Sequence, residues 1–245
     1  MMNPFSLEGK TILITGASSG IGRSTAIECS KMGAKIVLTG RNEERLKDTL
    51  SNLEGEGHSY IVADLSKPED IDNLVNQSPM LDGLVNNAGL NVVGLVQFIK
   101  QEDLYRIMDA NLNAPILLTN KIVKKKKIGK GGSIVFTSSI GKSVVAPGNS
   151  MYAATKGGLS AFMKNAAFKT AVKLSLPVLI SEETGDLAVG IDVDFFRCGN
   201  FGKSRHRHDV AGENDDETGT GGNLNVFHGH VEMLRRAEFG HIIGE

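Results

Sequence analysis

Two side chains spaced four residues apart could carry acid–base chemistry. Tyr152 and Lys156 follow the turn-forming run 147–150, and the apolar residues after it recur with helical spacing. On a helix such side chains share a face, so the Lys156 ammonium would lie a few ångströms from the phenol. A free tyrosine has a pKa of about 10, and a fixed cation lowers that pKa because it favours the phenolate. The pair predicts a general acid or base, although Tyr-x-x-x-Lys also occurs by chance on exposed helices.

Two further polar residues could take part in the same chemistry. Ser139 follows residues 133–137, an apolar run that predicts a buried strand. Its hydroxyl would project from the strand end, where catalytic groups of open α/β sheets collect. Residues 102–127 predict a helix that Asn111 and Pro115 interrupt. A buried kink there can free a backbone carbonyl to hold a water molecule, so Asn111 is the fourth candidate.

The elements that must position these groups begin with a strand, a glycine-rich loop and a helix. Residues 11–15 predict a short apolar strand, and the amphipathic run after the loop ends near Gly33. Glycines let backbone amides approach a pyrophosphate, and a helix N-terminus supplies free N–H groups and a positive dipole end. The spacing Gly-x-x-x-Gly-x-Gly therefore predicts a dinucleotide site, although such a turn can also be purely structural. Its candidate contact residues are Gly16, Ser18, Ser19, Gly20, Ile21 and Gly22.

The residues after the second predicted strand, 35–39, bear on the choice of cofactor. In a βαβ unit this strand end faces the adenosine ribose, where an acidic side chain holds the 2′-hydroxyl of NAD. The sequence has Gly40 and Arg41 there instead, and a guanidinium group suits a 2′-phosphate. We therefore expect NADP (NADPH) and consider NAD less favoured; the alternative for Arg41 is a solvated loop cation. Arg23 could assist or simply lie on a helix surface.

Two more strand ends complete the predicted cofactor surface. Residues 60–63 predict a strand that ends at Asp64 and Leu65. The Asp64 carboxylate would accept a hydrogen bond from the adenine amino group or merely start the next turn. Residues 81–85 predict a strand that opens into small residues and side-chain amides, which would let a cofactor pass close over the sheet. The candidates in this second loop are Asn87, Ala88 and Gly89.

The composition excludes several classes of protein. The 245 residues are 40% apolar and 22% charged, with a net charge of −1, which suits one α/β domain and gives no reason to expect nucleic acid or an anionic membrane as a partner. No run approaches the roughly 18 apolar residues of a membrane span. Cys29 and Cys198 are far apart and the N-terminus has no apolar signal segment, so we expect a cytoplasmic protein with free thiols. The basic run 124–127 is interpreted as surface.

In order and spacing, these motifs resemble those of the short-chain dehydrogenase/reductase family. The resemblance is carried by Thr15-Gly16-x-x-x-Gly20-x-Gly22, Asn86-Asn87-Ala88-Gly89, Asn111, Ser139 and Tyr152-x-x-x-Lys156. It implies an α/β fold with a doubly wound parallel sheet (Rossmann-like). It also implies an NADP(H)-dependent oxidoreductase that interconverts a carbonyl and a secondary alcohol. The members most similar in character are the 3-oxoacyl-(acyl-carrier-protein) reductases.

The resemblance also implies a role for each catalytic candidate. Tyr152 would donate or accept the proton, and Lys156 would lower its pKa and hold the nicotinamide ribose. Ser139 would orient the carbonyl, Asn111 would position a proton-relay water, and the hydride would come from the nicotinamide. The implied partners are a small carbonyl or alcohol substrate and further copies of the chain, in a homo-oligomeric dimer or tetramer. No metal is expected at this site.

The resemblance covers residues 7–166 and stops there. We therefore expect a dinucleotide-binding and catalytic core at residues 1–167, followed by an atypical, partly disordered segment at 168–245. The C-terminal strands and the substrate region would then be atypical or missing, with residues 178–181 and 188–196 as candidate replacement strands. A frameshift or splice at this boundary is one hypothesis, which nucleotide sequencing tests.

The tail leaves two other functions open. Residues 1–165 carry a net charge of +4 and residues 166–245 one of −5, and the polar, glycine-rich run 212–225 is typical of disorder. Without a recognisable substrate wall, the protein could bind NADP and be catalytically impaired or vestigial. Alternatively, the two His-x-His pairs at 206–208 and 228–230 could bind zinc, because imidazoles two apart on a strand share a face.

Overall fold

The structure is a computed structural model that describes residues 5–174, 178–183 and 193–196; from residue 167 onward only the backbone is described. Strands and helices alternate along the chain, as the spacing of the apolar residues predicts. The elements, with η marking 3-10 and π turns, are β1 (Thr11–Thr15), α1 (Gly20–Lys31), β2 (Lys35–Gly40), α2 (Glu43–Ser51), β3 (Ser59–Val62), α3 (Pro68–Gln77), β4 (Leu81–Asn86), η1 (Val96–Phe98), α4 (Gln101–Met108), η2 (Asp109–Asn113), α5 (Ala114–Lys124), β5 (Ile128–Ser139), η3 (Ile140–Lys142), α6 (Ser150–Leu174), β6 (Val178–Glu183) and β7 (Val193–Phe196).

The described strands form one sheet in the order β3-β2-β1-β4-β5-β6-β7. All neighbouring strands from β3 to β6 are parallel, and the last pair, β6 and β7, is antiparallel. The order of strands reverses direction at β1, because β1 leads to β2 on one side and β4 leads to β5 on the other. At such a switch point the loops after neighbouring strands diverge and leave room for a ligand. The predicted doubly wound parallel sheet is confirmed.

The sheet continues past β5 into the region where the sequence pattern becomes atypical. β6 contains the predicted replacement strand 178–181 and pairs with β5 from Ile134 opposite Val178 to Ser139 opposite Glu183. β7 covers the end of the second predicted replacement, whose first residues lie outside the described part of the chain. Residues Met1–Cys198 form one compact unit. The predicted boundary at residue 167 falls within α6 and stays a prediction.

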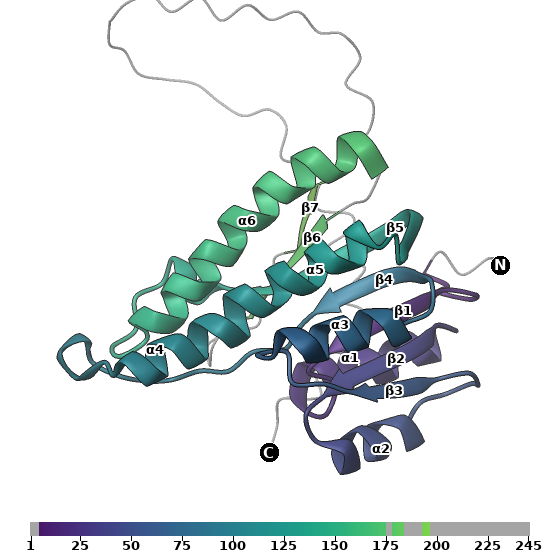
Figure 1. Ribbon diagram of the computed structural model, residues 1–245, viewed down its shortest axis with the longest axis horizontal. Coiled ribbons are helices and arrows are strands. Elements are labelled where there is room, and N and C mark those ends of the chain that lie inside the picture. Colours follow the sequence, from purple (N-terminus) through teal and green to yellow (C-terminus); the bar gives the residue numbers. More distant parts are fainter. Residues whose placement is uncertain (1–4, 175–177, 184–192, 197–245) are drawn as a thin grey trace, which may run out of the picture. The chain divides into compact units, whose positions relative to one another are not determined.

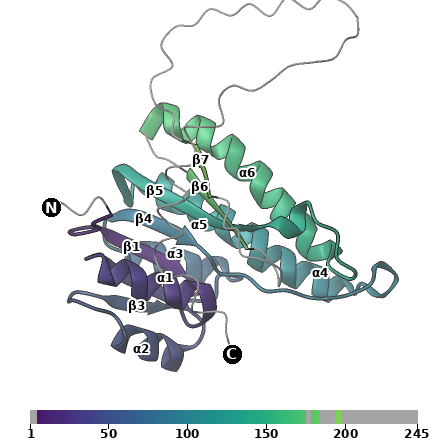
Figure 2. The same ribbon diagram turned by 180° about the vertical axis from the view of Figure 1, so that it is seen from behind.

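Two hydrophobic clusters hold helices on opposite faces of the sheet (Figures 1 and 2). Side chains alternate between the faces of a strand, so in β1 Leu13 points to one face while Ile12 and Ile14 point to the other. The Leu13 face is covered by α3, α5 and α6, and its cluster includes Phe136, which meets Phe162 edge to face at 6.2 Å. The opposite cluster joins β1 and β2 to α1 and α2. The loops that follow the parallel strands lie at the carboxyl edge of the sheet, beside these two clusters.

The predicted break in the long central helix is a π turn. Residues of η2 separate α4 from α5, and Asn111 in its middle is only 1% exposed. Pro115 has no N–H, so the carbonyl of Asn111 cannot accept the α-helical bond that residue 115 would normally donate. Single π turns of this kind occur often at functional sites, and this one faces the catalytic candidates on α6.

The basic run 124–127 lies just before β5, at the edge of the sheet opposite the carboxyl ends of the parallel strands. Lys125 Nζ donates to Asn76 Oδ1 at 2.6 Å, and Lys127 Nζ donates to the Ser78 carbonyl oxygen at 2.6 Å. Lys127 thus supplies a donor to backbone carbonyl oxygens at the C-terminal end of α3, where a cation also complements the helix dipole. Lys124 and Lys126 are exposed, so the prediction of a surface segment is confirmed. None of the described helices combines the length and apolar content that a membrane span requires.

Candidate active site

The glycine-rich loop leaves β1 at the carboxyl edge and presses against the loop that follows β4. Gly16 has a φ of 66°, and a Cβ there would lie 2.8 Å from the Cα of Ala88. A Cβ on Gly22 would overlap the carbonyl oxygen of Gly16 and lie 2.5 Å from Asn87 Nδ2. A Cβ on Gly20 would meet no atom within 4 Å. Two of the three glycines are therefore required by contacts within the protein, and Gly20 leaves an open surface for a ligand.

The hydroxyl group of Thr15 joins these two loops. It accepts hydrogen bonds from the backbone N–H groups of Asn87 and Ala88, both at 2.9 Å, and donates to the Val85 carbonyl oxygen at 3.3 Å. The Asn87 amide returns a bond from Nδ2 to the Thr15 carbonyl oxygen at 3.1 Å, and its Oδ1 accepts from Thr137. Strand ends β1, β4 and β5 are thus connected through polar groups that are mostly buried.

The N-terminus of α1 is arranged to receive an anion. Its N-cap residue, Ser19, makes no side-chain cap, and no acidic residue lies in the first turn. By contrast, α2, α3 and α4 each carry two acidic residues in the first turn. The positive dipole end of α1, like those of α5 and α6, therefore has no acidic side chain in its first turn, and the binding of a pyrophosphate there stays a prediction. Ile21, 45% exposed, borders this surface.

Arg41 follows β2 next to the same loop. A Cβ on Gly40 would lie 3.4 Å from Ser18 Oγ, so the end of β2 contacts the glycine-rich loop and brings the exposed Arg41 beside it. Burial raises the pKa of the Asp64 carboxyl, but hydrogen bonds from Ser66 and the charges of Arg41 and Lys67 outweigh burial and hold the pKa below its usual value. Arg41 therefore acts electrostatically on Asp64, and its contact with a 2′-phosphate stays a prediction.

Asp64 itself shapes the loop after β3. Its Oδ1 accepts hydrogen bonds from the backbone N–H of Ser66 at 3.1 Å and from Ser66 Oγ at 2.8 Å. This is the turn-starting role that the sequence left as the alternative to an adenine contact. The neighbouring Leu65 packs against the core cluster under α3. The contact of both residues with a cofactor stays a prediction.

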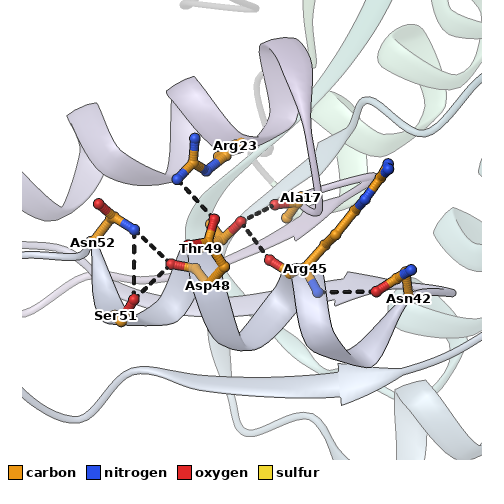
Figure 3. Close-up of polar contacts among 8 residues, drawn as sticks. All are labelled: Ala17, Arg23, Asn42, Arg45, Asp48, Thr49, Ser51 and Asn52. Carbon is orange, nitrogen blue, oxygen red and sulfur yellow. Dashed lines mark hydrogen bonds and ion pairs between the residues drawn. The ribbon is translucent and has the colours of Figure 1, made fainter.

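Helix α2 is fixed to the glycine-rich loop and to α1 (Figure 3). Thr49 Oγ1 donates to the Ala17 carbonyl oxygen at 3.0 Å, and Arg23 Nη2 forms an ion pair with Asp48 Oδ2 at 2.9 Å. Asn42 Oδ1 caps α2 by accepting from the Arg45 N–H at 2.9 Å. One nitrogen of the Arg23 guanidinium group therefore connects α1 to α2.

Lys156 and Tyr152 lie together on the first turns of α6. Lys156 is 4% exposed, and its Nζ donates to the Thr137 carbonyl oxygen at 2.7 Å. The same ammonium lies 5.6 Å from the centroid of the Tyr152 ring. A buried cation is costly unless it is hydrogen-bonded, so the β5 carbonyl both holds the ammonium and fixes its position beside the ring. The predicted i, i+4 proximity of the pair is present.

Ser139 ends β5 beside the same tyrosine. Its Oγ accepts from the Gly141 N–H at 3.0 Å, which turns the chain into η3. A Cβ built on Gly141 would lie 3.2 Å from Ser139 Oγ and 3.6 Å from Tyr152 Cδ1. The serine hydroxyl and the tyrosine ring thus approach one point above Gly141, which Asn149 Nδ2 also approaches at 3.4 Å.

Asn111 reaches the site from the π turn. Its Oδ1 accepts from the Leu90 N–H at 2.8 Å, and its Nδ2 donates to the Leu90 carbonyl oxygen at 2.8 Å and to Thr155 Oγ1 at 3.3 Å. Thr155 in turn donates to the Tyr152 carbonyl oxygen at 2.7 Å. The side chain therefore ties the loop after Gly89 to α6, and a water at this site would bind the backbone of the π turn.

Comparison with known proteins decides the family. The family model described as short chain dehydrogenase matches residues 10–175, more than half of the chain. The chain belongs to the short chain dehydrogenase family. The predicted family and oxidoreductase class, acting on CH–OH groups with NAD(P), are confirmed. The match covers every catalytic and cofactor candidate named above and ends one residue after α6.

Known relatives of this short chain dehydrogenase include reductases and dehydrogenases. The 3-oxoacyl-[acyl-carrier-protein] reductase FabG of Rickettsia felis is 36% identical over 167 residues, which are 68% of this chain and 69% of the relative. Glucose 1-dehydrogenase of Gluconobacter oxydans is 32% identical, and the matched region covers 67% of this chain and 65% of that relative. A short chain dehydrogenase from Burkholderia cenocepacia, solved in complex with NADP, superposes with a TM-score of 0.67 at 30% identity and covers 71% of this chain and 73% of its own.

Sequence reasoning missed several residues of this short chain dehydrogenase that organise the site. Thr137 and Thr155 hydrogen-bond Lys156 and Asn111 respectively. These two act through contacts between elements far apart in the sequence, which no local spacing reveals. Thr15 was part of the predicted glycine-loop motif, but its role in joining the two loops was not predicted.

Several predictions lie outside the part of the chain that the structure describes. The polar run 212–225 and both His-x-His pairs fall there, so the predicted disorder and the alternative zinc site stay predictions. Within the described residues, no group of three or more His, Cys, Asp or Glu side chains could hold a metal ion.

Proposed function

We propose that this short chain dehydrogenase uses NADP(H) to interconvert a carbonyl and a secondary alcohol, with Tyr152 as general acid in reduction and general base in oxidation. The observation that carries the proposal is the buried Lys156 ammonium, fixed by the Thr137 carbonyl oxygen at 2.7 Å and 5.6 Å from the Tyr152 ring centroid. A cation held there favours the phenolate and so makes the phenol a usable proton donor near neutral pH.

The cofactor site follows from the loops at the carboxyl edge. The open face of Gly20 and the uncapped N-terminus of α1 would bind the pyrophosphate, and Arg41 would bind the 2′-phosphate. The Burkholderia cenocepacia relative contains NADP, and so does landomycin C-6 ketoreductase LanV, which is 27% identical with a TM-score of 0.66. When bound, the cofactor supplies or accepts the hydride.

The side chains complete the proton half of the reaction. In reduction, the Tyr152 O–H bond breaks and its proton joins the carbonyl oxygen as the carbonyl carbon receives hydride. The phenolate left behind is stabilised by Lys156, and Ser139 Oγ–H orients the carbonyl oxygen by donating a hydrogen bond to it. A water on the backbone of the π turn at Asn111 would return the proton to Tyr152. Oxidation of the alcohol reverses each step.

The direct test is NADPH consumption with a 3-oxoacyl thioester, followed by nicotinamide absorbance. We expect turnover by the wild type and a loss of about 10²-fold or more in Tyr152→Phe, since a positioned general acid typically contributes 10²- to 10⁴-fold. NADPH affinity of Tyr152→Phe should stay within about twofold, because the phosphate-binding loops are intact. Tyr105→Phe, at an exposed tyrosine on α4, is the matched control. Full activity in Tyr152→Phe would refute the assigned proton donor.

The end of the family match at residue 175 favours a second candidate, an NADP-binding protein without turnover. The proposed cofactor loops and catalytic side chains lie within residues 10–175, whereas the last 70 residues of the chain lie outside the match. Calorimetry decides between the two candidates together with the assay above. Micromolar NADPH binding combined with no activity on a panel of ketones, aldehydes and 3-oxoacyl thioesters would select the second one.

A further inference from the structure

Two buried serines join β5 to α6 and have no part in the chemistry described so far. Ser138 Oγ and Ser160 Oγ lie 3.0 Å apart and share a hydrogen bond. Ser138 is fully buried, and Ser160 is 6% exposed. Alternate residues of a strand face the same side, so Ser138 faces α6 together with Phe136, which meets Phe162 of that helix. The hydroxyl pair therefore continues the contact between strand and helix with a polar group on each side.

On the strand, Ser138 lies between two groups of the site. The carbonyl oxygen of the preceding residue, Thr137, accepts from Lys156 Nζ at 2.7 Å, and the following residue is Ser139. On the helix, Ser160 follows Lys156 by four residues, so these two side chains share a face of α6. A displacement of the end of β5 along α6 would therefore distort both hydrogen bonds at once.

Stability alone does not require hydroxyl groups at this contact. A buried serine on a helix can bond the carbonyl four residues earlier, as Ser78 Oγ does with the Leu74 carbonyl oxygen at 2.7 Å. Ser160 bonds across to the strand instead. Replacing both partners of a buried neutral hydrogen bond by apolar groups of the same shape can leave stability nearly unchanged. What the hydroxyl pair adds to an apolar contact is a fixed distance and direction between the two elements.

We propose that Ser160 is a positioning residue for the active site, whose hydrogen bond to Ser138 fixes the alignment of α6 with the end of β5. The proposal rests on the function proposed above. In that mechanism Tyr152 of α6 protonates a carbonyl oxygen that Ser139 of β5 orients. The two groups that act on this oxygen thus come from the two elements that the serine pair joins, and a misplacement of about 1 Å in an active site can cost about 10²-fold in rate.

The test removes the hydrogen bond from each side and then from both sides. Ser160→Ala and Ser138→Ala each leave one buried hydroxyl without its partner, whereas the double variant leaves neither hydroxyl. Ser78→Ala is the matched control, because it removes a buried, hydrogen-bonded serine hydroxyl at the opposite edge of the sheet. The readouts are kcat and KM for a 3-oxoacyl thioester, NADPH affinity and the melting temperature.

We expect the melting temperature to fall in both single variants and to return toward the wild-type value in the double variant, which has no unpartnered hydroxyl. By contrast, kcat should fall about tenfold in all three variants, because the alignment is lost in each of them. KM and NADPH affinity should stay within about twofold, and Ser78→Ala should keep the wild-type kcat. A purely structural role predicts that kcat recovers together with the melting temperature in the double variant. That recovery, or an unchanged kcat in all three variants, overturns the proposal.

A measurement that needs no turnover separates this proposal from the proposed function. The chain has three tyrosines, so carbon-13 labelling of the tyrosine rings gives few signals, and the one missing in Tyr152→Phe belongs to Tyr152. We expect that signal to move in the double serine variant while those of Tyr60 and Tyr105 stay in place, because only Tyr152 lies on α6. Such a shift in a protein without turnover supports the positioning role even though the proposed function fails. An unmoved Tyr152 signal overturns the positioning role whatever the activity.

Discussion

The charge of Arg41 gives a residue-level prediction about cofactor choice. Arg41→Asp replaces a cation facing the 2′-phosphate with a carboxylate that repels it and can accept from a 2′-hydroxyl. We expect NADPH affinity to fall by roughly 10- to 100-fold, the range that follows from losing one charge-assisted hydrogen bond, while NADH affinity rises. Titration of each cofactor by calorimetry measures both changes.

Lys130→Asp is the matched control for this charge reversal. Lys130 is exposed and lies early in β5, at the edge of the sheet opposite the cofactor loops. The same change in net charge there should leave the ratio of NADPH to NADH affinity unaltered. An unchanged ratio in Arg41→Asp as well would exclude Arg41 as the discriminating residue.

Cys29 gives a residue-level prediction about pH. Burial, with a smaller effect of the neighbouring Glu28 charge, raises the pKa of its thiol to about 11. In the unfolded chain the thiol ionises near its ordinary pKa of about 8.5, so the unfolded state loses its proton first as pH rises. Stability should therefore fall between pH 9 and 11 more steeply in the wild type than in Cys29→Ala. Urea unfolding at a series of pH values measures this, and parallel curves would contradict it.

At this scale, sequence reasoning found the residues whose roles depend on short spacing. Tyr152 and Lys156 are one helical turn apart, so any helix brings them together. Thr137 and Thr155 were missed because their partners lie 19 and 44 residues away.

Among the elements, the glycine-rich loop tolerates the least change. Gly22→Ala would place a methyl group against the Gly16 carbonyl oxygen and 2.5 Å from Asn87 Nδ2. Because backbone atoms cannot retreat as a flexible side chain can, we expect a loss of about 1–3 kcal/mol in the free energy of unfolding. NADPH binding should weaken at least tenfold, since the two loops that face the cofactor are pushed apart. Thermal unfolding and calorimetry measure the two effects.

Gly157→Ala is the contrasting substitution on α6. A Cβ there meets no atom within 4 Å, and glycine within a helix is about 0.5–1 kcal/mol less favourable than alanine. This variant should gain stability by that amount and keep wild-type NADPH affinity. If Gly22→Ala were equally stabilising, the close contact between the two loops would be refuted.

The elements were predicted well where the apolar period is strong. Strands β1, β2 and β4 and the α1 helix agree with the sequence within a residue or two. β5 begins five residues earlier than predicted, because Ile128 already pairs with Leu81 of β4. Residues 129–132 break the apolar pattern, and the register shifts across them before Ser133 pairs with Gly83. The interruption at Pro115 was predicted from its missing N–H, but only the structure shows that it is a π turn.

For the molecule as a whole, the role of the segment after the family match can be tested by two truncations. Ending the chain after residue 198 keeps the compact unit Met1–Cys198, in which β6 pairs with β5 up to Ser139. Ending it after residue 167 removes the end of α6 and leaves β5 as an open edge beside Ser139. We expect the longer form to bind NADPH like the full chain and the shorter form to melt at least 5 °C lower or aggregate, by the loss of about 2 kcal/mol or more.

Limited proteolysis of the full chain complements the truncations. The composition of residues 212–225 predicts early cleavage there, with a protected core that contains residues 1–165. Truncated forms of equal and undiminished NADPH affinity would show that the boundary at 167 marks the true end of the cofactor domain. Uniform resistance from end to end would instead show that the tail packs as part of the fold.

The hydroxyl of Thr15 connects residues that leave the ribosome at very different times. Its partner Ala88 lies 73 residues later, and the bond from Asn111 to Thr155 spans a further 44. Contacts of such long range form late, because the loops between them must first be closed. A nascent chain that has built β1, α1 and β2 therefore has no cofactor site. NADPH can stabilise only molecules whose strands through β5 are assembled, so its supply would select finished chains over partly folded ones.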